Sequence, residues 1–405
     1  MEPARLLQLS ATEIHELIRT GNTTVEEYAL TLIQRCDQRQ PEVHAWVHYN
    51  KEGIITQARA LDALPTNKRG PLHGVAVGIK DIFLTKGMQY MPTRYGSAIH
   101  ENDDNAPADS AAVAILRAAG ALILGKTATT EFAATGVGTS CTNPHNPRHS
   151  PGGSSSGSAA AVADFQVPIS MGSQTGGSII RPGAYNGIYA FKPTWGLIST
   201  EGMGRFSTTC DTIGFFANTV HDLYLLAKVF RLDFDTVPNP HPFQIKQARI
   251  AFVTTHVWDH AGPGTHAAWQ KARSLLSATG AVLEDVDLPE PFARCCDWQK
   301  VVIAGEGRTA FLSIENSVDN NWTEYVDSVN KLHPTLANFV DNPNPPTRKE
   351  LVQAYDSISE LRQRWDRVAC QYDAIITPSV TDEAPEGLGS TGSSSPLFEF
   401  VNLKT

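Results

Sequence analysis

The chain has 405 residues, of which 41% are hydrophobic and 19% are charged. This composition is typical of a folded globular protein and excludes a disordered chain. The formal net charge of −9 argues against a concentrated basic face, so we expect no nucleic-acid partner. No apolar run is long enough to span a membrane, and the N-terminus lacks a signal-peptide pattern. We therefore expect a cytoplasmic protein that does not contact a membrane.

The cysteines give no sign of a metal site or a disulfide framework. None of the six belongs to a CxxC pair, and we expect reduced thiols, no metal and no cofactor. They are Cys36, Cys141, Cys210, Cys295, Cys296 and Cys370.

The first section, residues 1–65, reads as helical. Ser10 with Glu13, and Thr24 with Glu27, each form a capping-box pattern ahead of apolar residues at helical spacing. Gly21 is placed to end the first of these helices. We assign no chemistry to this section.

Alternating strands and helices follow. A short apolar strand over 72–79 ends at Lys80, a helix capped by Ser110 runs to Ala119, and 121–124 reads as a buried strand. This alternation predicts an α/β protein with helices on both faces of a sheet.

Residues 221–370 form a more variable section. It contains a predicted helix at 221–230 and a strand at 248–253, and another strand follows at 374–376. The Gly/Ser-rich stretch 387–395 is expected to be a mobile loop. We treat the whole chain, 1–405, as one domain.

Two familiar motifs do not fit their surroundings. Residues 120–127 match the P-loop pattern, but the four residues between the glycines are apolar and read as a strand. Residues 153–157 match the GxSxG pattern, yet an irregular segment precedes them where a nucleophile elbow needs a strand. We favour neither nucleotide binding nor a Ser-His-Asp hydrolase.

Three further segments point to chemistry together. Lys80 closes a strand, Ser154 lies in a Gly/Ser-rich segment that opens a helix, and Ser178 lies in a Gly-Gly-Ser segment 24 residues later. Residues 141–196, which hold both serines, contain apolar runs that a flexible linker lacks, so they are expected to fold as loops within the domain.

In these segments, over roughly residues 10–380, the sequence resembles the amidase signature family. The segments 125–132, 191–194 and 211–214 match the family as well. The resemblance implies a single large mixed β-sheet flanked by helices on both faces. It also implies a catalytic triad with Ser178 as nucleophile, Ser154 as a bridging serine with a cis peptide bond, and Lys80 as base.

The chemistry of these residue types agrees with the roles. A serine hydroxyl needs a base to take its proton, and a lysine serves only when it is uncharged. The pKa of Lys80 would have to fall from about 10.4 to near 7 or 8, which takes roughly 4 kcal/mol of desolvation and charge effects. Ser154 can relay the proton because a hydroxyl both donates and accepts.

The substrate-binding residues are expected at the same place. Main-chain amides of Thr175, Gly176, Gly177 and Ser178 can converge on the substrate carbonyl oxygen. Together with Ser154 they form the predicted binding set. Each such donor is worth on the order of 3 kcal/mol in the transition state.

Each residue has a plainer interpretation when taken alone. Lys80 could be a surface lysine, Ser154 the N-cap of the following helix, and Ser178 a loop serine. Arg181 is expected to be structural, bound to a loop carboxylate or carbonyl. The order and spacing of the three residues together favour the amidase site.

Two features depart from the family pattern. Many members carry Asp where this chain has Gln174, a variant that we treat as tolerated. Members usually continue beyond the segment resembling 395–405, so we expect either a truncated chain or a naturally short, weakly active protein with an uncovered sheet edge.

The sequence therefore predicts an amide hydrolase that forms a serine acyl-enzyme on a small-molecule amide. One alternative is a glutamine-dependent amidotransferase subunit with a stable protein partner, and another is a catalytically poor scaffold. A homodimer also remains open. Residues 292–350 are the expected specificity segment, although their sequence does not identify a substrate.

Overall fold

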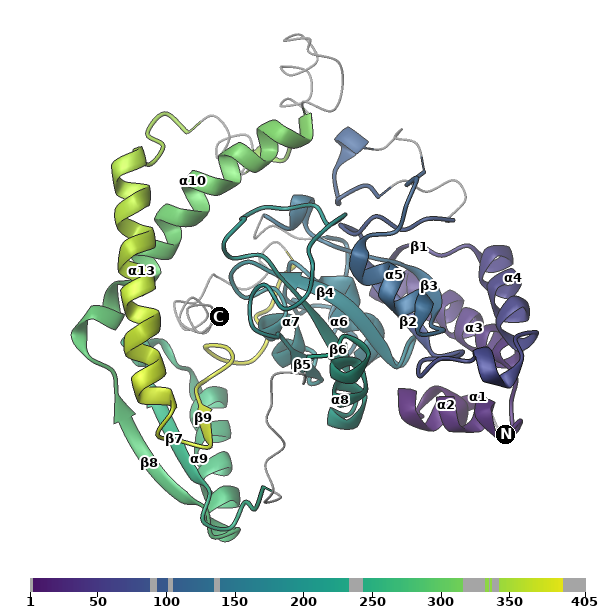
Figure 1. Ribbon diagram of the computed structural model, residues 1–405, viewed down its shortest axis with the longest axis horizontal. Helices are drawn as coiled ribbons and strands as arrows, with labels where there is room; N and C mark the ends of the chain where they lie inside the picture. The colour runs from purple at the N-terminus through teal and green to yellow at the C-terminus, as the bar shows by residue number, and fades with distance from the viewer. Residues whose placement is uncertain are drawn as a thin grey trace.

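A computed structural model describes residues 3–87, 93–100, 105–134, 139–232, 243–315, 332–334, 336 and 342–388, without the side chains of residues 3 and 308–315. Figure 1 shows a central sheet with helices around it, and beside it a second, smaller sheet with its own helices. No described helix is long and apolar enough to cross a membrane.

The central sheet is mixed and has six strands in the order β1-β3-β2-β4-β6-β5. Strands β2 and β3 run parallel, as do β2 and β4, while the outer pairs β1–β3, β4–β6 and β6–β5 are antiparallel. The bounds are β1 Trp46–His48, β2 Ala76–Lys80, β3 Leu122–Thr127, β4 Ile169–Gln174, β5 Tyr189–Phe191 and β6 Thr212–Ala217. The parallel centre brings the carboxyl ends of β2 and β4 to one edge, where Lys80 and Gln174 lie.

Side chains on the two faces of this sheet belong to separate hydrophobic clusters. In β3, Leu122 and Leu124 pack in the cluster that holds α3 and α6, while Ile123 packs in the cluster that holds α5 and α8. This period of two is the geometry of a strand buried on both sides. The predicted α/β fold with helices on both faces is confirmed.

The helices around the central sheet begin and end near their predicted positions. Ser10 and Thr24 form the two predicted capping boxes with Glu13 and Glu27, and Gly21, with φ +74°, follows the first helix. The bounds are α1 Pro3–Leu7, α2 Ala11–Arg19, α3 Val25–Val43, α4 Lys51–Asp62, α5 Ala111–Ala118, α6 Ser156–Ala163, α7 Ile180–Tyr185 and α8 Val220–Val229. Short 3-10 turns cover Thr66–Lys68, Ala98–His100 and Glu131–Ala133.

The second sheet is parallel, with three strands in the order β8-β7-β9. Its elements are β7 Arg249–Thr254, α9 Pro263–Ala278, β8 Val282–Asp287, α10 Cys295–Glu315, α13 Arg348–Ala369 and β9 Ala374–Ile376, with 3-10 turns at Trp258–His260 and Glu290–Arg294. The two strands predicted at 248–253 and 374–376 pair here and not with the central sheet, so the described strands form two sheets where the sequence predicted one. Apolar periodicity identifies a strand but not its neighbour, which is why this division was missed.

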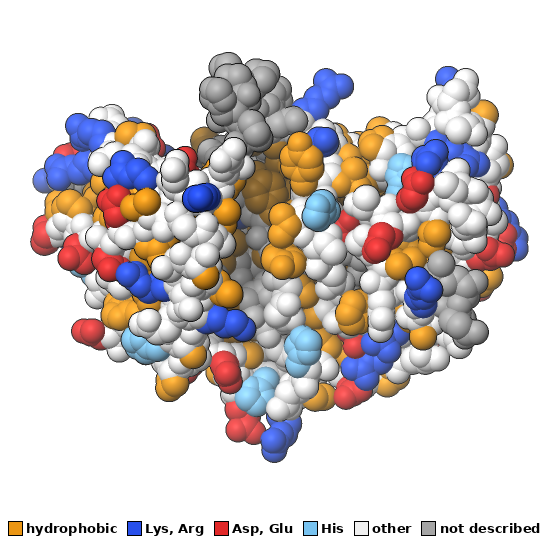
Figure 2. Space-filling model, turned by 90° about the horizontal axis from the view of Figure 1, so that it is seen from below, with side chains coloured by type: hydrophobic (Ala, Val, Ile, Leu, Met, Phe, Trp, Pro, Cys, Tyr) orange, Lys and Arg blue, Asp and Glu red, His pale blue; other side chains and the backbone are white. Residues whose placement is uncertain are grey.

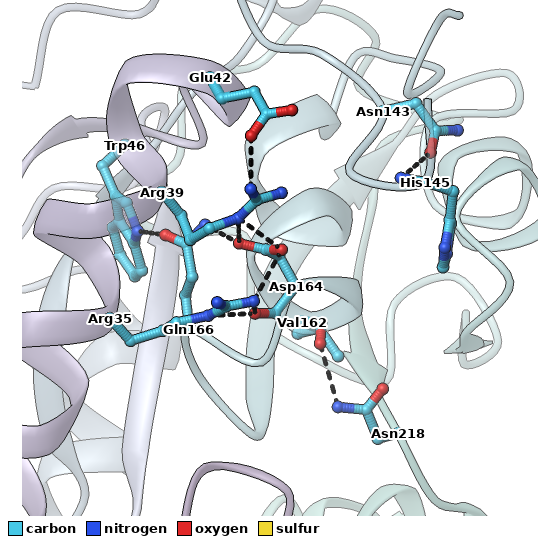
Figure 3. A network of polar contacts seen from close by, with 10 residues as sticks. All are labelled: Arg35, Arg39, Glu42, Trp46, Asn143, His145, Val162, Asp164, Gln166 and Asn218. Atoms are coloured by element: carbon cyan, nitrogen blue, oxygen red, sulfur yellow. Dashed lines mark hydrogen bonds and ion pairs between the residues drawn. The ribbon is translucent and has the colours of Figure 1, made fainter. Parts of the chain in front are cut away.

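A polar network fixes the far end of α6. The carboxylate of Asp164, directly after this helix, binds Arg35 at 2.9 Å and Arg39 at 3.0 Å, both on α3 (Figure 3). Gln166 accepts a hydrogen bond of 2.6 Å from the indole of Trp46 in the same view. Because every residue of α6 is buried, these bonds fix the helix that follows the Gly/Ser-rich segment.

The space-filling view shows a hollow between the part that carries the second sheet and the part that carries the central sheet (Figure 2). Hydrophobic side chains gather along it. Of the predicted mobile loop, only residues 387 and 388 fall in the described part of the chain; the rest lies outside it.

Candidate active site

Lys80 is buried at the end of a central strand. Its side chain is 0% exposed, and its Nζ lies 2.7 Å from Ser154 Oγ and 2.9 Å from Ser173 Oγ. Burial lowers the pKa of the Lys80 amine well below its ordinary value, the Arg181 cation lowers it further, and the Asp211 carboxylate acts in the opposite direction. The surface-lysine interpretation is therefore wrong.

The segment that holds Ser154 is shaped by close backbone contacts. Gly152 has φ +72°, and a Cβ added there would lie 2.9 Å from the Cα of Pro182, so only glycine fits. The peptide bond between Gly153 and Ser154 is cis. Arg181 donates to the carbonyl oxygen of Gly153 from Nε at 3.1 Å and from Nη2 at 2.8 Å. The predicted structural role of Arg181, with a loop carbonyl as its partner, is confirmed.

The N-cap interpretation of Ser154 is wrong by one residue. Ser155 occupies the N-cap of α6, and its hydroxyl donates to the carbonyl oxygen of Ser173 at 3.1 Å without capping the helix. This leaves the Ser154 hydroxyl beside Lys80. Ser155, at the centre of the GxSxG pattern, is fully buried and bound to β4, which fits a packing role and not an exposed nucleophile.

Ser178 lies in the loop between β4 and α7 and is 7% exposed. The side-chain oxygen of Gln174 accepts hydrogen bonds from the amides of Ile179, at 2.7 Å, and Ile180, at 3.0 Å. The side chain of Gln174 thus fixes the start of α7, directly after Ser178. Since Arg181 binds Gly153 from α7, the helix that follows this loop, the segments of Ser178 and Ser154 are tied together.

The loop ahead of Ser178 borders open space at one glycine. A Cβ built on Gly176 meets no heavy atom within 4 Å, which leaves room for a ligand to approach the main chain there. The hydroxyl of the preceding Thr175 donates to Asp211 Oδ1 at 2.5 Å and orients the start of the loop. The predicted convergence of the four main-chain amides on a substrate oxygen stays a prediction.

Asp211 is a residue whose role the sequence did not reveal. Its Oδ2 accepts hydrogen bonds from the amides of Phe206, at 2.7 Å, and Ser207, at 3.0 Å. Burial raises the pKa of Asp211 to about 6, while its hydrogen bonds with Thr175, Ser207 and Phe206 act to lower it. The segment 211–214 was noted only as a match to the family.

Glu306 on α10 was missed altogether. Its Oε2 accepts hydrogen bonds from the Ser207 hydroxyl, at 2.5 Å, and from the Thr209 amide, at 3.1 Å. Its Oε1 accepts hydrogen bonds from the Thr209 hydroxyl, at 2.8 Å, and from the hydroxyl of Tyr355 on α13. The carboxylate therefore joins two helices of the second part to the loop that carries Asp211. Its one sequence signal is an acidic residue within an apolar run, inside the segment 292–350.

Lys126, from the P-loop pattern, is a second buried lysine with a different environment. The strand predicted at 121–124 is β3, which runs from Leu122 to Thr127 and so includes Lys126 itself. The Lys126 ammonium lies 3.1 Å from Asp81 Oδ1 and donates to the carbonyl oxygen of Phe83 at 2.6 Å. Burial lowers the pKa of Lys126, while the Asp81 carboxylate acts to raise it.

The match to a family settles the relationship of the chain to known proteins. The family model described as Amidase matches residues 27–399. The chain belongs to the amidase signature family. Two solved relatives have the same fold at 25% identity and a TM-score of 0.82, and each match covers 98% of this chain and 89% of the other. One is described as an amidase, the other as part of a vestigial complex that reveals the origins of an s-triazine catabolic enzyme.

Curated relatives give a second comparison. The chain is 38% identical over 306 residues to a glutamyl-tRNA(Gln) amidotransferase subunit from Salinispora arenicola (strain CNS-205), a match covering 70% of this chain and 62% of that protein. The corresponding protein of Thermobifida fusca (strain YX) is 37% identical, with 70% and 60% covered. The chain thus matches less than two thirds of the length of these relatives. A solved fatty acid amide hydrolase shares the fold, at 20% identity and a TM-score of 0.82. The match covers 99% of this chain and 73% of the hydrolase chain.

Proposed function

We propose that this protein hydrolyses a carboxylic amide through an acyl-enzyme on Ser178, with Ser154 and Lys80 as its proton relay. The observation that carries the proposal is the 2.7 Å contact between the Lys80 amine and the Ser154 hydroxyl, inside a site where Lys80 has no exposed surface. A buried amine whose partners are neutral hydroxyls loses its proton readily, and this is the property a base requires.

The reaction begins with the nucleophile. Ser178 Oγ attacks the carbonyl carbon of the amide, its proton passes to Ser154, and the proton of Ser154 passes to the uncharged Lys80 amine. The carbonyl oxygen becomes an oxyanion, which the amides of Thr175, Gly176, Gly177 and Ser178 stabilise. The room beside Gly176 supports this placement of the substrate oxygen.

The intermediate then collapses. The C–N bond breaks, and the leaving nitrogen takes a proton from Lys80 by way of Ser154, which returns the amine to its uncharged form. Water attacks the Ser178 ester with the same relay as its base, and the carboxylic acid leaves. Lys80 therefore acts in both halves of the reaction.

The test is ammonia release from a panel of small primary amides. Ser178→Ala and Lys80→Ala should lower kcat by about a thousandfold or more, as is typical when a member of such a unit is removed. Ser277→Ala, on the exposed side of α9, is the matched control and should turn over like the wild type. Undiminished turnover by Ser178→Ala would remove the mechanism.

Covalent labelling separates an active enzyme from a catalytically poor scaffold. A serine-reactive fluorophosphonate should add to the wild type and to Ser277→Ala, and not to Ser178→Ala. A wild-type protein that is folded, yet neither labelled nor active on any amide, would show that Ser178 is not activated.

A second candidate function comes from the relatives. Several proteins named as subunits of glutamyl-tRNA(Gln) amidotransferase are 34–38% identical to this chain. In that role, the chain would release ammonia from glutamine and pass it to an acceptor held by a stable protein partner. Size-exclusion chromatography of a native extract distinguishes the two functions, because elution as a monomer or homodimer contradicts the amidotransferase.

A further inference from the structure

A cavity of about 270 Å³ lies between the loop that carries Asp211 and the helices α10 and α13. Thr209 and Cys210 form its wall on the loop side, while Gln299 and Val302 of α10 and Arg362 of α13 line the opposite side. Its volume is slightly below the usual range for pockets that bind small molecules, so it suits a small occupant. In Figure 1 the two helices stand side by side at the edge of the second part.

Two polar groups on the cavity wall have no partner within the described structure. Gln299 is 2% exposed, and its side-chain oxygen is buried without a hydrogen bond. The Nε–H of Arg362 is likewise buried and unpaired, and no described carboxylate forms an ion pair with this guanidinium. An unsatisfied buried polar atom costs about 1–3 kcal/mol, so a bound molecule that supplied the missing partners would recover that energy.

The chemistry of the wall restricts the occupant. Arg362 supplies a cation and a hydrogen-bond donor, which favour a carboxylate. The oxygen of Gln299 accepts from an N–H or O–H group. Val302 and Ile358 add apolar surface for a short hydrocarbon segment between the polar ends. No acidic side chain among the described lining residues repels an anion.

The cavity lies one loop away from the catalytic residues. Cys210 precedes Asp211, whose carboxylate binds the Thr175 hydroxyl at 2.5 Å and interacts electrostatically with Lys80. Thr209 and Tyr355, which both line the cavity, also bind the Glu306 carboxylate that fixes this loop. The wall of the cavity and the surroundings of Lys80 are therefore connected through this one loop.

We infer that this cavity is the specificity pocket for the distal end of the substrate, and that the preferred substrates are amides whose acyl chain ends in a carboxylate. This inference rests on the proposed function. It assigns Arg362 to the carboxylate and Gln299 to a donor on the chain, in a segment where the sequence identified no chemistry.

Binding tests the inference without turnover. In a Ser178→Ala background, succinamate, glutaramate and adipamate are titrated by calorimetry, with hexanamide as the uncharged counterpart. At least one carboxylated amide should bind more tightly than hexanamide. Arg362→Met should weaken that binding roughly tenfold or more, the effect of losing a charged hydrogen bond. Arg364→Met, on the solvent side of the same helix, is the matched control and should bind like its parent.

Gln299→Leu gives a second, uncharged probe of the pocket. The substitution removes the unpaired oxygen without a change of net charge. It should therefore weaken the binding of a ligand that carries an amino group, such as glutamine, more than the binding of glutaramate. Circular dichroism confirms that each variant is folded, and the Arg362 and Gln299 variants together keep the test informative if one of them fails to fold.

Turnover then separates this inference from the proposed function. Selective binding that depends on Arg362 supports the pocket even if the wild type releases no ammonia. The absence of ammonia release would overturn only the proposed hydrolase function. Equal binding of hexanamide and the carboxylated amides, or equal losses in Arg362→Met and Arg364→Met, overturns the pocket. Hydrolysis with no preference for carboxylated amides overturns the pocket and leaves the hydrolase standing.

Discussion

The two buried lysines have different polar neighbours, although both side chains are almost fully buried. Lys126 is 2% exposed and lies 3.1 Å from the Asp81 carboxylate; burial lowers the pKa of Lys126, and the carboxylate acts against this effect without cancelling it. Lys80 is 0% exposed, and its nearest polar partners are the hydroxyls of Ser154 and Ser173. Burial is the largest cause of the lowered pKa at both lysines, but a carboxylate adjoins Lys126 directly, whereas the hydroxyls around Lys80 carry no charge that would hold its proton.

The pH dependence of the reaction follows from this difference. Lys80 accepts a proton only in its uncharged form, so kcat/KM should rise with pH through the pKa of Lys80 and level off above it. Because burial lowers that pKa, the plateau should begin well below the value near 10.4 of a solvated lysine. Amide hydrolysis from pH 5 to 10 measures this, and a rise centred near 10 would contradict it.

Asp211 should set the position of that rise. Its carboxylate raises the pKa of Lys80, so Asp211→Asn should let the pKa fall further and shift the rising limb to lower pH. The substitution also turns an amide NH2 toward donor groups of Thr175, Phe206 or Ser207, which should lower kcat by about tenfold. If the substitution only reduced the amount of folded protein, kcat/KM would fall by the same factor at every pH and the rise would stay at the same pH. That result would exclude the electrostatic role of Asp211.

At the scale of elements, the sequence predicted what depends on local pattern. The capping boxes at Ser10 and Thr24 set two helix starts, and the apolar run before Lys80 indicated a strand, although β2 begins only at Ala76. The three site residues were predicted from the resemblance to the amidase signature family, and the structure brings Lys80 to Ser154. A local pattern does not say which elements meet across the fold.

Glu306 and the second sheet were missed because they depend on such long-range contacts. Glu306 binds Ser207 and Thr209, about a hundred positions earlier, and Tyr355, about fifty positions later, so its neighbours in sequence give no hint of its role. The second sheet was missed for the same reason, since β7 pairs with β9 only after α13 has intervened. Long-range pairing is set by how elements pack, which one sequence does not reveal.

Glu306 should therefore matter to catalysis although it touches no reacting group. Glu306→Gln replaces one acceptor oxygen by an NH2 group, which cannot satisfy the donors of the loop at 207–209. We expect kcat/KM to fall about tenfold at a temperature where the variant is fully folded, together with slower fluorophosphonate labelling of Ser178. Glu360→Gln, an exposed carboxylate on α13, is the control. Equal labelling rates in both variants would show that Glu306 supports only stability.

At the scale of the whole molecule, one segment spans the two parts. Near the second sheet, Asp382 Oδ1 accepts from the Gly264 amide at the start of α9, at 2.8 Å. A few residues later, the carbonyl oxygen of Ala384 lies 2.6 Å from His149 Nδ1. The carbonyl oxygen of Pro385 accepts a hydrogen bond of 2.9 Å from the amide of Ser150. The segment 382–387 thus joins the second part to the loop that leads into Ser154.

Removal of this segment should impair the active site from a distance. Chains ended after Leu388 and after Glu383 differ only in residues 384–388, so the pair isolates these contacts. The shorter chain should have a kcat/KM about tenfold lower and a lower melting temperature, because the loop at 148–150 loses three hydrogen bonds. His149→Ala, which removes one of them, should give a smaller loss in the same direction, with the exposed His260→Ala as its control. Equal activity of the two shortened chains would show that the loop keeps Ser154 in place without the second part.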